Sequence, residues 1–206
     1  TFYVNHGVLK NGLYSFTKSE STITTDGASI PGGPWMGSIM AAISGSSKEK
    51  SATLDLNGNK LTVDTGYNAT VGIAGIGSGK VEINNAGAMS VNGERAALYA
   101  NGGGMITIHN GHDSAGTLTL RAGGSNPSSV AVVKTMNGAD GVTSSITIDG
   151  LVDILADAKA EDGHGANEAV SAVASDINIG GGTIKAINGA WAAIRAYGEF
   201  VSQNYG

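Results

Sequence analysis

The stretch ALYANGGGMITIHNGHDSAGTLTLRA (97–122) decides the fold. It contains three short runs in which apolar residues alternate with small or polar ones: ALYA (97–100), MITI (105–108) and TLTL (117–120). A period of two predicts a β-strand with one buried face. Glycines 102–104 and the pair Asn110-Gly111 separate the runs as turns. Three such strands cannot bury their apolar face alone, so we expect this unit to be one coil of a stacked repeat.

The same three runs recur through the rest of the chain. Copies of the middle run are TLDLN (53–57), KVEINN (80–85), MITIHN (105–110), SITIDG (145–150) and DINIGG (176–181). Copies of the last run are KLTV (60–63), AMSV (88–91), TLTL (117–120), LVDIL (151–155) and TIKAI (183–187). Copies of the first run are GSIMAA (37–42), TVGIAG (70–75), AALYAN (96–101), SVAVVK (129–134), AVSAVAS (169–175) and AWAAIRA (190–196). This order predicts an all-β protein, a right-handed single-stranded parallel β-helix with three strands per coil and about six coils.

The alternation also assigns the core. Expected inward pairs of the middle run are Leu54/Leu56, Val81/Ile83, Ile106/Ile108, Ile146/Ile148 and Ile177/Ile179. Expected inward pairs of the last run are Leu61/Val63, Met89/Val91, Leu118/Leu120, Val152/Ile154 and Ile184/Ala186. A slip of one residue would expose every one of these side chains. The first run is rich in Ala, Gly and Ser, so we expect its strands to approach a neighbouring surface closely or to pack tightly inside.

One corner has its own column of turn residues. The residues that close the middle run are Asn57, Asn84, His109, Asp149 and Gly180. Asn, Asp and Gly tolerate the left-handed backbone that a sharp turn requires. Because turns favour these residue types anyway, the column supports the fold and does not indicate a site.

The two ends of the chain depart from the repeat. Residues 1–36 are predicted to be an N-terminal cap or an irregular first coil, since Pro31 and Pro34 break the pattern just before Trp35. Residues 37–206 are predicted to be the β-helix repeats. The last stretch, GEFVSQNYG (198–206), begins another strand and stops, so we expect a chain that is truncated at its C-terminus.

Composition limits the classes of function. The 206 residues include 33 glycines, and only 14% of the residues are charged. The net charge is −5 and arginine occurs only at Arg95, Arg121 and Arg195, which argues against nucleic-acid binding. There is no cysteine, and therefore no disulfide or thiolate metal site. No apolar run approaches the roughly 20 residues of a membrane-spanning helix, so no membrane insertion is expected.

The repeat resembles the passenger domains of Gram-negative autotransporters, which are secreted by the type V route. Its clearest copies are AALYANGGGMITIHNG (96–111) followed by GTLTLRA (116–122), and EAVSAVASDINIGGGTIKAING (168–189). The resemblance covers roughly residues 37–200. It implies an extracellular β-helix of adhesin type, displayed on a bacterial cell surface. It carries over no functional residue, because passengers share a scaffold and not a site.

Parallel β-helices also include polysaccharide lyases and hydrolases, and paired carboxylates would indicate such an enzyme. Asp55 and Glu82 occupy the same outward column in adjacent predicted coils, about one strand spacing apart. A solvated face explains them as well. His164 lies between Gly163 and Gly165, as in polygalacturonases, but the paired aspartates and Arg-x-Lys element of that family are missing. No catalytic residue, cofactor or metal site is therefore predicted.

Binding residues concentrate in loops on a rigid scaffold, so the insertions are the predicted ligand site. The longest insertion, ADAKAEDGHGANE (156–168), is dense in charge for this chain. The second, KTMNGADGVTSS (134–145), is shorter and leaves a different corner. The candidate ligand-binding residues are Asp157, Lys159, Glu161, Asp162, His164, Asn167, Glu168, Asn137 and Asp140. A solvated loop is the alternative for each insertion. Trp35, Trp191 and Tyr197 are possible carbohydrate platforms, although packing in a cap or core is the favoured interpretation.

We therefore expect a non-enzymatic surface adhesin fragment. Its partner would be a glycan or protein of a host or bacterial surface, or a second copy of the chain. Two alternatives remain open at this point. One is a carbohydrate-active β-helix enzyme that uses Asp55 and Glu82, and the other is a structural stalk.

Overall fold

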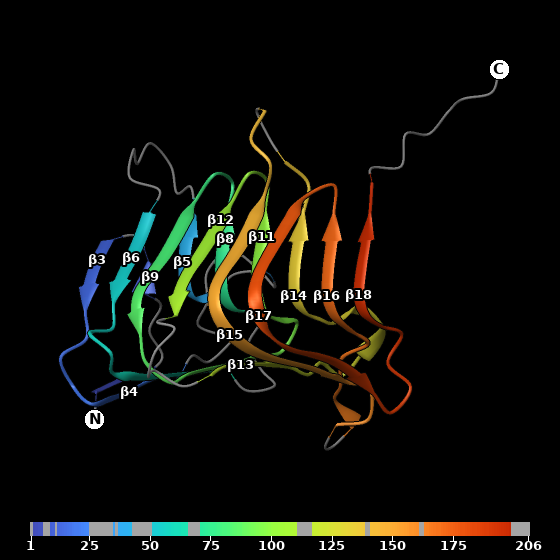
Figure 1. Cartoon of the computed structure of the whole chain (residues 1–206), viewed down its shortest axis with the longest axis horizontal. Coiled ribbons are helices and arrows are strands. Elements are labelled where there is room, and N and C mark those ends of the chain that lie inside the picture. The colour runs from blue at the N-terminus through green and yellow to red at the C-terminus, as the bar shows by residue number, and fades with distance from the viewer. Residues whose placement is uncertain are drawn as a thin grey trace.

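The computed structural model describes residues 2–5, 9–10, 12–24, 35, 37–42, 51–65, 71–110, 117–138, 141–160 and 163–198. Strands make up nearly all of the regular structure in these ranges, which also include the short 3₁₀ turn Pro127–Ser129. Every pairing between the strands is parallel, and the strands form two sheets. This confirms the predicted all-β fold of stacked parallel strands, which Figure 1 shows edge on.

The larger sheet, sheet A, has eleven strands and is curled into two arms. One arm contains β3 (Gly12–Ser15), β6 (Ser51–Asp55), β9 (Lys80–Ala86) and β12 (Met105–Asn110). The other arm contains β1 (Phe2–Asn5), β4 (Glu20–Thr24), β7 (Lys60–Asp64), β10 (Met89–Gly93) and β13 (Leu118–Ala122). The long strands β15 (Ser145–Asp157) and β17 (Asp176–Ile187) bend from the first arm into the second, so they join both.

The smaller sheet, sheet B, has seven strands and faces the hollow of sheet A. Its strands are β2 (Leu9–Lys10), β5 (Gly37–Ala42), β8 (Val71–Ile76), β11 (Ala96–Asn101), β14 (Ala131–Met136), β16 (Glu168–Val173) and β18 (Ala192–Tyr197). The three predicted runs thus correspond to sheet B and to the two arms of sheet A.

The core fills the space between the sheets. Ile83, Ile108 and Ile148 lie in one column of the first arm and are at most 1% exposed. Burying one such side chain stabilises the fold by about 1.5–3 kcal/mol. The predicted alternation is therefore correct in these coils. In the last strand of the stack, β17, the same column continues at Ile179, which is only half-buried because no described strand covers it.

Two predicted registers are wrong by two residues. Leu54 pairs with Ile83 and not with Val81, which faces Ala52. At the other end, Ile184 pairs with Ile154, and Val152 faces Gly182. A shift of two leaves every side chain on its predicted face. Alternation alone therefore cannot tell the correct register from the shifted one.

The corner between the arms also differs from the prediction. Runs 145–150 and 151–155 were expected to be separate strands, but they form the single strand β15, in which Gly150 has a φ of 115°. The left-handed asparagines near this corner are Asn57 (φ 49°) and Asn85 (φ 52°). Asn84, His109, Asp149 and Gly180 are not among the described residues with positive φ. The predicted turn column was thus misplaced, because Asp55 and not Asn57 pairs with Asn84.

Strands β1 to β4 pair in parallel with β4, β5, β6 and β7. This part of residues 1–36 therefore continues the two sheets. The division of the chain at residue 36 stays a prediction. Pro31 and Pro34 lie outside the described residues, as do 199–206 of the predicted last strand.

Candidate functional site

The outer face of sheet B is the part of the surface where aromatic and basic side chains meet. One outward row crosses successive strands of the sheet at the same register. Its members are Met40, Ala74, Tyr99, Lys134, Ser171 and Arg195. The row begins with apolar and small residues on β5 and β8 and ends with charged ones on β14 and β18. The stacking thus brings residues that are far apart in the sequence into one row.

Trp35 covers the first part of this face. Its ring lies against Tyr99, with 4.6 Å between ring centroids and 32° between ring planes. Below it, Met40, Val71, Ala74, Ala96 and Tyr99 form a second hydrophobic cluster, separate from the main core. Small side chains on β8 and β11 leave room for the indole ring. The favoured prediction for Trp35 was packing in a cap or core; the structure places it half-buried against this separate cluster on the outer face of sheet B.

Two cations lie over the Trp35 ring. The Arg95 guanidinium carbon is 5.3 Å from the ring centroid, and the Lys134 Nζ is 5.0 Å from it. At these distances the negative face of an aromatic ring attracts a cation. Trp35 thus fixes Arg95, from the turn before β11, and Lys134, from β14, next to each other.

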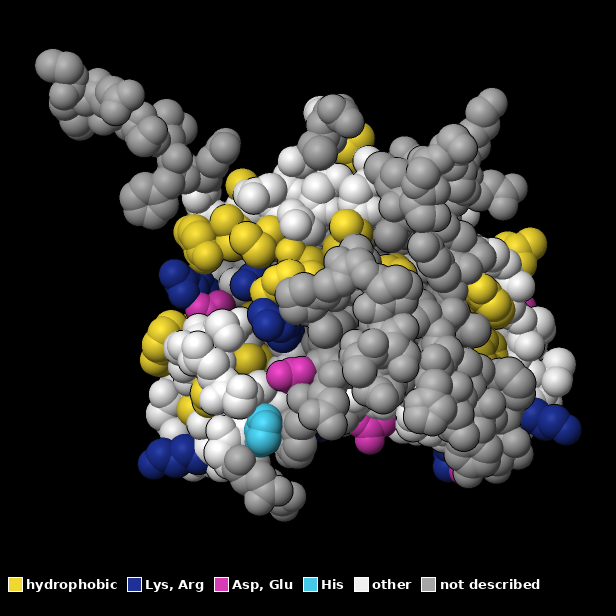
Figure 2. Space-filling model, turned by 180° about the vertical axis from the view of Figure 1, so that it is seen from behind, with side chains coloured by type: hydrophobic (Ala, Val, Ile, Leu, Met, Phe, Trp, Pro, Cys, Tyr) yellow, Lys and Arg dark blue, Asp and Glu magenta, His cyan; other side chains and the backbone are white. Residues whose placement is uncertain are grey.

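A third cation and a carboxylate complete the group. Arg195 donates a short hydrogen bond to Glu168, whose residue is only 8% exposed. The Arg195 guanidinium also lies 4.6 Å from the centroid of the Tyr197 ring. The hydrogen bond that Arg195 donates to Glu168 and the negative charge of that carboxylate both raise the pKa of Arg195. We call Trp35, Arg95, Tyr99, Lys134, Glu168 and Arg195 the aromatic–cationic cluster. Figure 2 shows Lys and Arg side chains close to Asp or Glu and hydrophobic side chains on the face seen from behind.

The electrostatics of the cluster favour an anion. Burial lowers the pKa of Lys134, Glu168 opposes that effect, and Arg195 and Arg95 lower it further. Three cations therefore share one carboxylate, which is already bonded to Arg195. Burial raises the pKa of the neighbouring Glu94 carboxyl group, and the charges of Arg95 and His164 oppose that effect.

The residues predicted from the long insertion do not converge on one exposed site. Asp157 accepts hydrogen bonds from the Lys159 backbone nitrogen and from Asn188 Nδ2, both at 2.9 Å, so it shapes a turn. Lys159 is exposed. Asn167 is buried and its carbonyl accepts from Trp191, whereas Glu168 joins the aromatic–cationic cluster. Glu161 and Asp162 lie outside the described residues.

His164 lies beside an anchored part of the same insertion. Gly165 and Gly124 exchange two backbone hydrogen bonds of 3.0 and 3.1 Å, which hold the insertion on the preceding coil. From the second insertion, Asn137 has a left-handed φ of 37° and its carbonyl accepts from Ser144 and Gly102. Asn137 is thus a turn residue. Asp140 lies outside the described residues.

The proposed pair of carboxylates is not formed. Asp55 faces Asn84, and Glu82 faces Thr53, so the two carboxylates are not stacked on adjacent strands. Asp55 instead accepts 3.0 Å hydrogen bonds from Asn85 Nδ2 and the Asn57 backbone nitrogen. These bonds lower the pKa of Asp55. The adjacency expected from the sequence was wrong because it rested on the shifted register of β6.

Glu82 has a different neighbour. The Nε2 atom of His109 lies 3.9 Å from Glu82, and its Nδ1 atom lies 3.9 Å from Asp149.

Within the described ranges, no three His, Asp or Glu side chains are placed to hold a metal ion. None of the described helical residues forms a helix long and apolar enough to cross a membrane.

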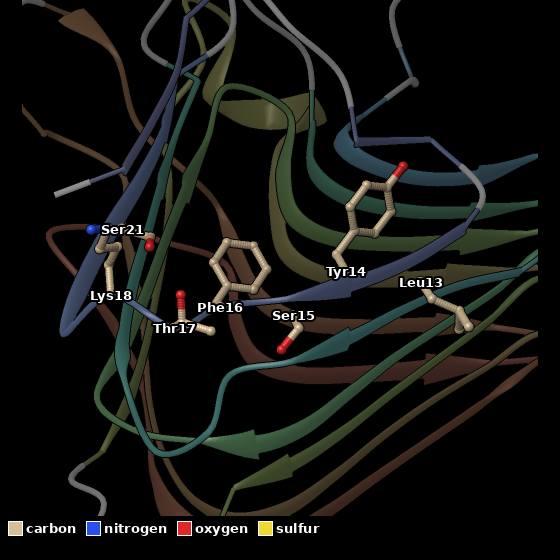
Figure 3. Close-up of a pocket in the computed structure, with 7 residues that line it drawn as sticks. All are labelled: Leu13, Tyr14, Ser15, Phe16, Thr17, Lys18 and Ser21. Carbon is tan, nitrogen blue, oxygen red and sulfur yellow. The ribbon is translucent and has the colours of Figure 1, made fainter.

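The hollows at the two ends of the stack belong to the scaffold. Figure 3 shows a pocket of about 460 Å³ lined by Leu13, Tyr14, Ser15, Phe16, Thr17, Lys18 and Ser21. A second hollow, of about 330 Å³, is lined by Ile177, Ile179, Ile184 and Ile194 among others. The second hollow exposes apolar side chains at the end of the core, whereas the lining of the first also includes the polar side chains of Ser15, Thr17, Lys18 and Ser21.

Comparisons with protein families, curated proteins and solved structures find no match for this chain. The function must therefore be argued from the residues themselves.

Sequence reasoning singled out Trp35, Tyr197 and Glu168 but missed Arg95 and Lys134 as members of one group. A usable signal was present in the first run. Aligning its copies places Tyr99, Lys134, Ser171 and Arg195 in one column, which alternates with inward residues. The position of Trp35 over that column had no such signal, because it enters from outside the repeat.

Proposed function

We propose that this chain is a non-catalytic binding module of an extracellular bacterial surface protein, an adhesin fragment. The observation that carries this proposal is the aromatic–cationic cluster. It gathers three cations on one sheet face of a chain whose net charge is −5. The rigid ladders of β11, β14, β16 and β18 hold the group in place before any ligand arrives. Such preorganisation lowers the entropic cost of binding.

The partner in this proposal is a glycan or protein of a host or bacterial surface, or a second copy of the chain. The resemblance of the repeats to autotransporter passenger domains supports the location and the adhesive role. It also underlies the finer fold proposal, a right-handed winding with about six coils. The lack of cysteine agrees with secretion through a narrow pore.

Catalysis on polysaccharides has less support. A glycosidase needs two carboxylates held roughly 5–10 Å apart across a substrate. Asp55 is engaged by Asn57 and Asn85, and Glu82 lies beside His109. We therefore favour binding over turnover.

Display of the chain on a non-adhesive bacterium tests the proposal. Cells carrying it should bind one member of a panel of glycans, matrix proteins and bacterial cells, or clump with each other. A Lys134→Glu variant should bind less than a Lys80→Glu variant, which changes the net charge equally on the exposed surface of sheet A. Absence of both binding and clumping would contradict the adhesin proposal.

A further inference from the structure

We propose that the aromatic–cationic cluster binds an acidic polysaccharide, with Arg95, Lys134 and Arg195 contacting its carboxylate or sulfate groups. This inference rests on the proposed function and names the ligand class for it.

The cluster has unused positive charge. Lys134 is largely buried, and burial lowers its pKa; the charge of Glu168 opposes that effect, and Arg195 and Arg95 add to it. Among the residues that the structure describes, no carboxylate lies at ion-pair distance from Lys134 or Arg95. Holding a half-buried ammonium without an anion in direct contact is unfavourable. A bound carboxylate or sulfate would relieve that cost through charge-assisted hydrogen bonds.

Two of the cations follow a line along the stack. Lys134 on β14 and Arg195 on β18 occupy one row and are separated by the single strand β16. Two strand spacings correspond to roughly 10 Å between their backbones. Arg95, from the turn that precedes β11, lies outside this row, but its guanidinium lies over the same Trp35 ring as Lys134. An extended polymer that lies along the axis of the stack would meet Arg195 and Lys134 in turn and reach Arg95 beside Trp35.

The spacing fits a sparsely charged polymer. Duplex DNA carries one charge per about 1.7 Å, and its binding needs densely clustered Lys and Arg. Here three cations span several strands of an acidic protein, so a polyanion of that density would be repelled by the rest of the surface. A polysaccharide with one acidic group every one or two sugar units carries fewer charges per length.

The apolar part of the surface also fits sugar rings. Tyr197 is 39% exposed, and the Arg195 guanidinium lies over its ring. The C–H face of a pyranose can pack on an aromatic ring while its acidic group reaches the guanidinium. An acidic peptide fits less well. The backbone of β14 is bonded on both sides within the sheet, and a peptide added as a strand would need the free edge of β18.

Direct binding of the purified chain tests the inference. The probes are a polysaccharide with one sulfate per two sugar units, polygalacturonate and neutral dextran, with duplex DNA and poly-glutamate as other polyanions. We expect the two acidic polysaccharides to bind in a salt-dependent way and dextran not to bind. Comparison of the sulfated probe with the carboxylated one identifies the preferred acidic group. Equal binding of dextran, or equally tight binding of DNA or poly-glutamate, would overturn the proposal.

Variants then place the site. Lys134→Gln and Arg95→Gln should each weaken binding roughly tenfold, the loss expected for one charge-assisted contact. Lys80→Gln removes the same charge from sheet A and should leave binding unchanged. Arg95→Lys should keep most of the affinity, and thermal unfolding checks that each variant is folded. Equal effects of the Lys134 and Lys80 substitutions would refute the site.

The surface-display assay separates the two proposals. If displayed cells still adhere when both Lys134→Gln and Arg95→Gln are present, the adhesin function stands and the polysaccharide site is refuted. If the purified chain binds the acidic polysaccharides but displayed cells neither adhere nor clump, the site stands and the adhesin function is refuted.

Discussion

The outer faces of the two sheets follow the same alternation but differ in what they do with it. On sheet A, the outward column of Thr62, Ser90 and Thr119 is exposed or half-buried and faces water with small hydroxyl side chains. On sheet B, the equivalent outward positions are covered by the Trp35 side chain or occupied by Lys134 and Arg195. Inward residues therefore give the chain its fold, whereas outward residues give each face its chemistry.

The difference shows where this chain departs from a minimal scaffold. Polar outward residues on sheet A satisfy each other across coils, as Asn85 does with Asp55 at 3.0 Å. Sheet B places a largely buried cation next to two others, which a scaffold alone does not require. A local departure from good packing or pairing is expected at a functional site.

The largest expected change in the free energy of unfolding comes from removing the Trp35 side chain, which covers part of sheet B. Trp35→Ala should destabilise the fold by about 2–3 kcal/mol, somewhat less than a fully buried tryptophan, since the residue is half-buried. Thr119→Ala on sheet A should change stability by less than about 0.5 kcal/mol. Urea unfolding at one pH measures both. Similar losses for the two variants would show that the outer faces contribute alike.

The next effect concerns one ion pair on each sheet. Glu168 pairs with Arg195 on sheet B and is almost buried, whereas Arg121 and Asp153 form a 3.1 Å pair between half-exposed side chains on sheet A. Exposed pairs contribute up to about 1 kcal/mol. A double-mutant cycle should give a larger coupling for the Glu168–Arg195 pair. Equal couplings would mean that burial of Glu168 does not strengthen the interaction.

A smaller effect of opposite sign is expected at Lys134. Because its folded-state pKa is below the ordinary value of 10.5, its charge costs stability at neutral pH, and the cost is relieved as the pH rises through the folded pKa. Lys134→Met should therefore stabilise the fold at pH 7, on the order of 0.5 kcal/mol, while weakening polysaccharide binding. Lys80→Met is the control. A destabilised Lys134→Met variant would show that the cation–π contact outweighs burial.

The smallest effects are two pH dependences of opposite direction. Because the pKa of Asp55 is lower in the folded state than its ordinary value of 3.8, the carboxylate stabilises the fold at pH values above 3.8. This stabilisation is lost as the pH falls through the folded-state pKa. Because the pKa of Glu94 is higher in the folded state than its ordinary value of 4.5, the protonated carboxyl group stabilises the fold at pH values below 4.5. This stabilisation is lost as the pH rises through the folded-state pKa. Asp55→Asn should thus lower the melting temperature at pH 7, and Glu94→Gln should raise it. Both differences should vanish near pH 2, and NMR titration reads the two pKa values directly.

Much of the fold could be predicted from the sequence because it depends on a local rule. Inward Ile106 and Ile108 follow from a period of two, and the three runs correspond to the observed strands. The registers of β6 and β17 could not be predicted, since a shift of two residues preserves the pattern. The lengths of the loops decide between such registers, and alternation contains no information about loop conformation.

The candidate site was only partly predictable for a related reason. Glu168 and Trp35 were noticed as single residues, but the sequence does not show that they share one face. Their proximity depends on the stacking of β11, β14, β16 and β18 in one register. Predicting a binding site from the loops also overlooked the flat face of sheet B, where the first run has its outward positions.

The continuous strands β15 and β17 limit where new sequence can be added to this protein. At the corner that they cross, both keep the backbone bonded to each other before and after the bend, from Ser145 to Asp157. Residues inserted after Gly150 would break that ladder in both arms of sheet A. Residues inserted between Gly138 and Gly141 would lie between two strands and leave the hydrogen bonds of Asn137 and Ser144 to the neighbouring coils in place. A peptide tag placed at the second position should be tolerated, so this corner is the natural point for grafting a new binding loop.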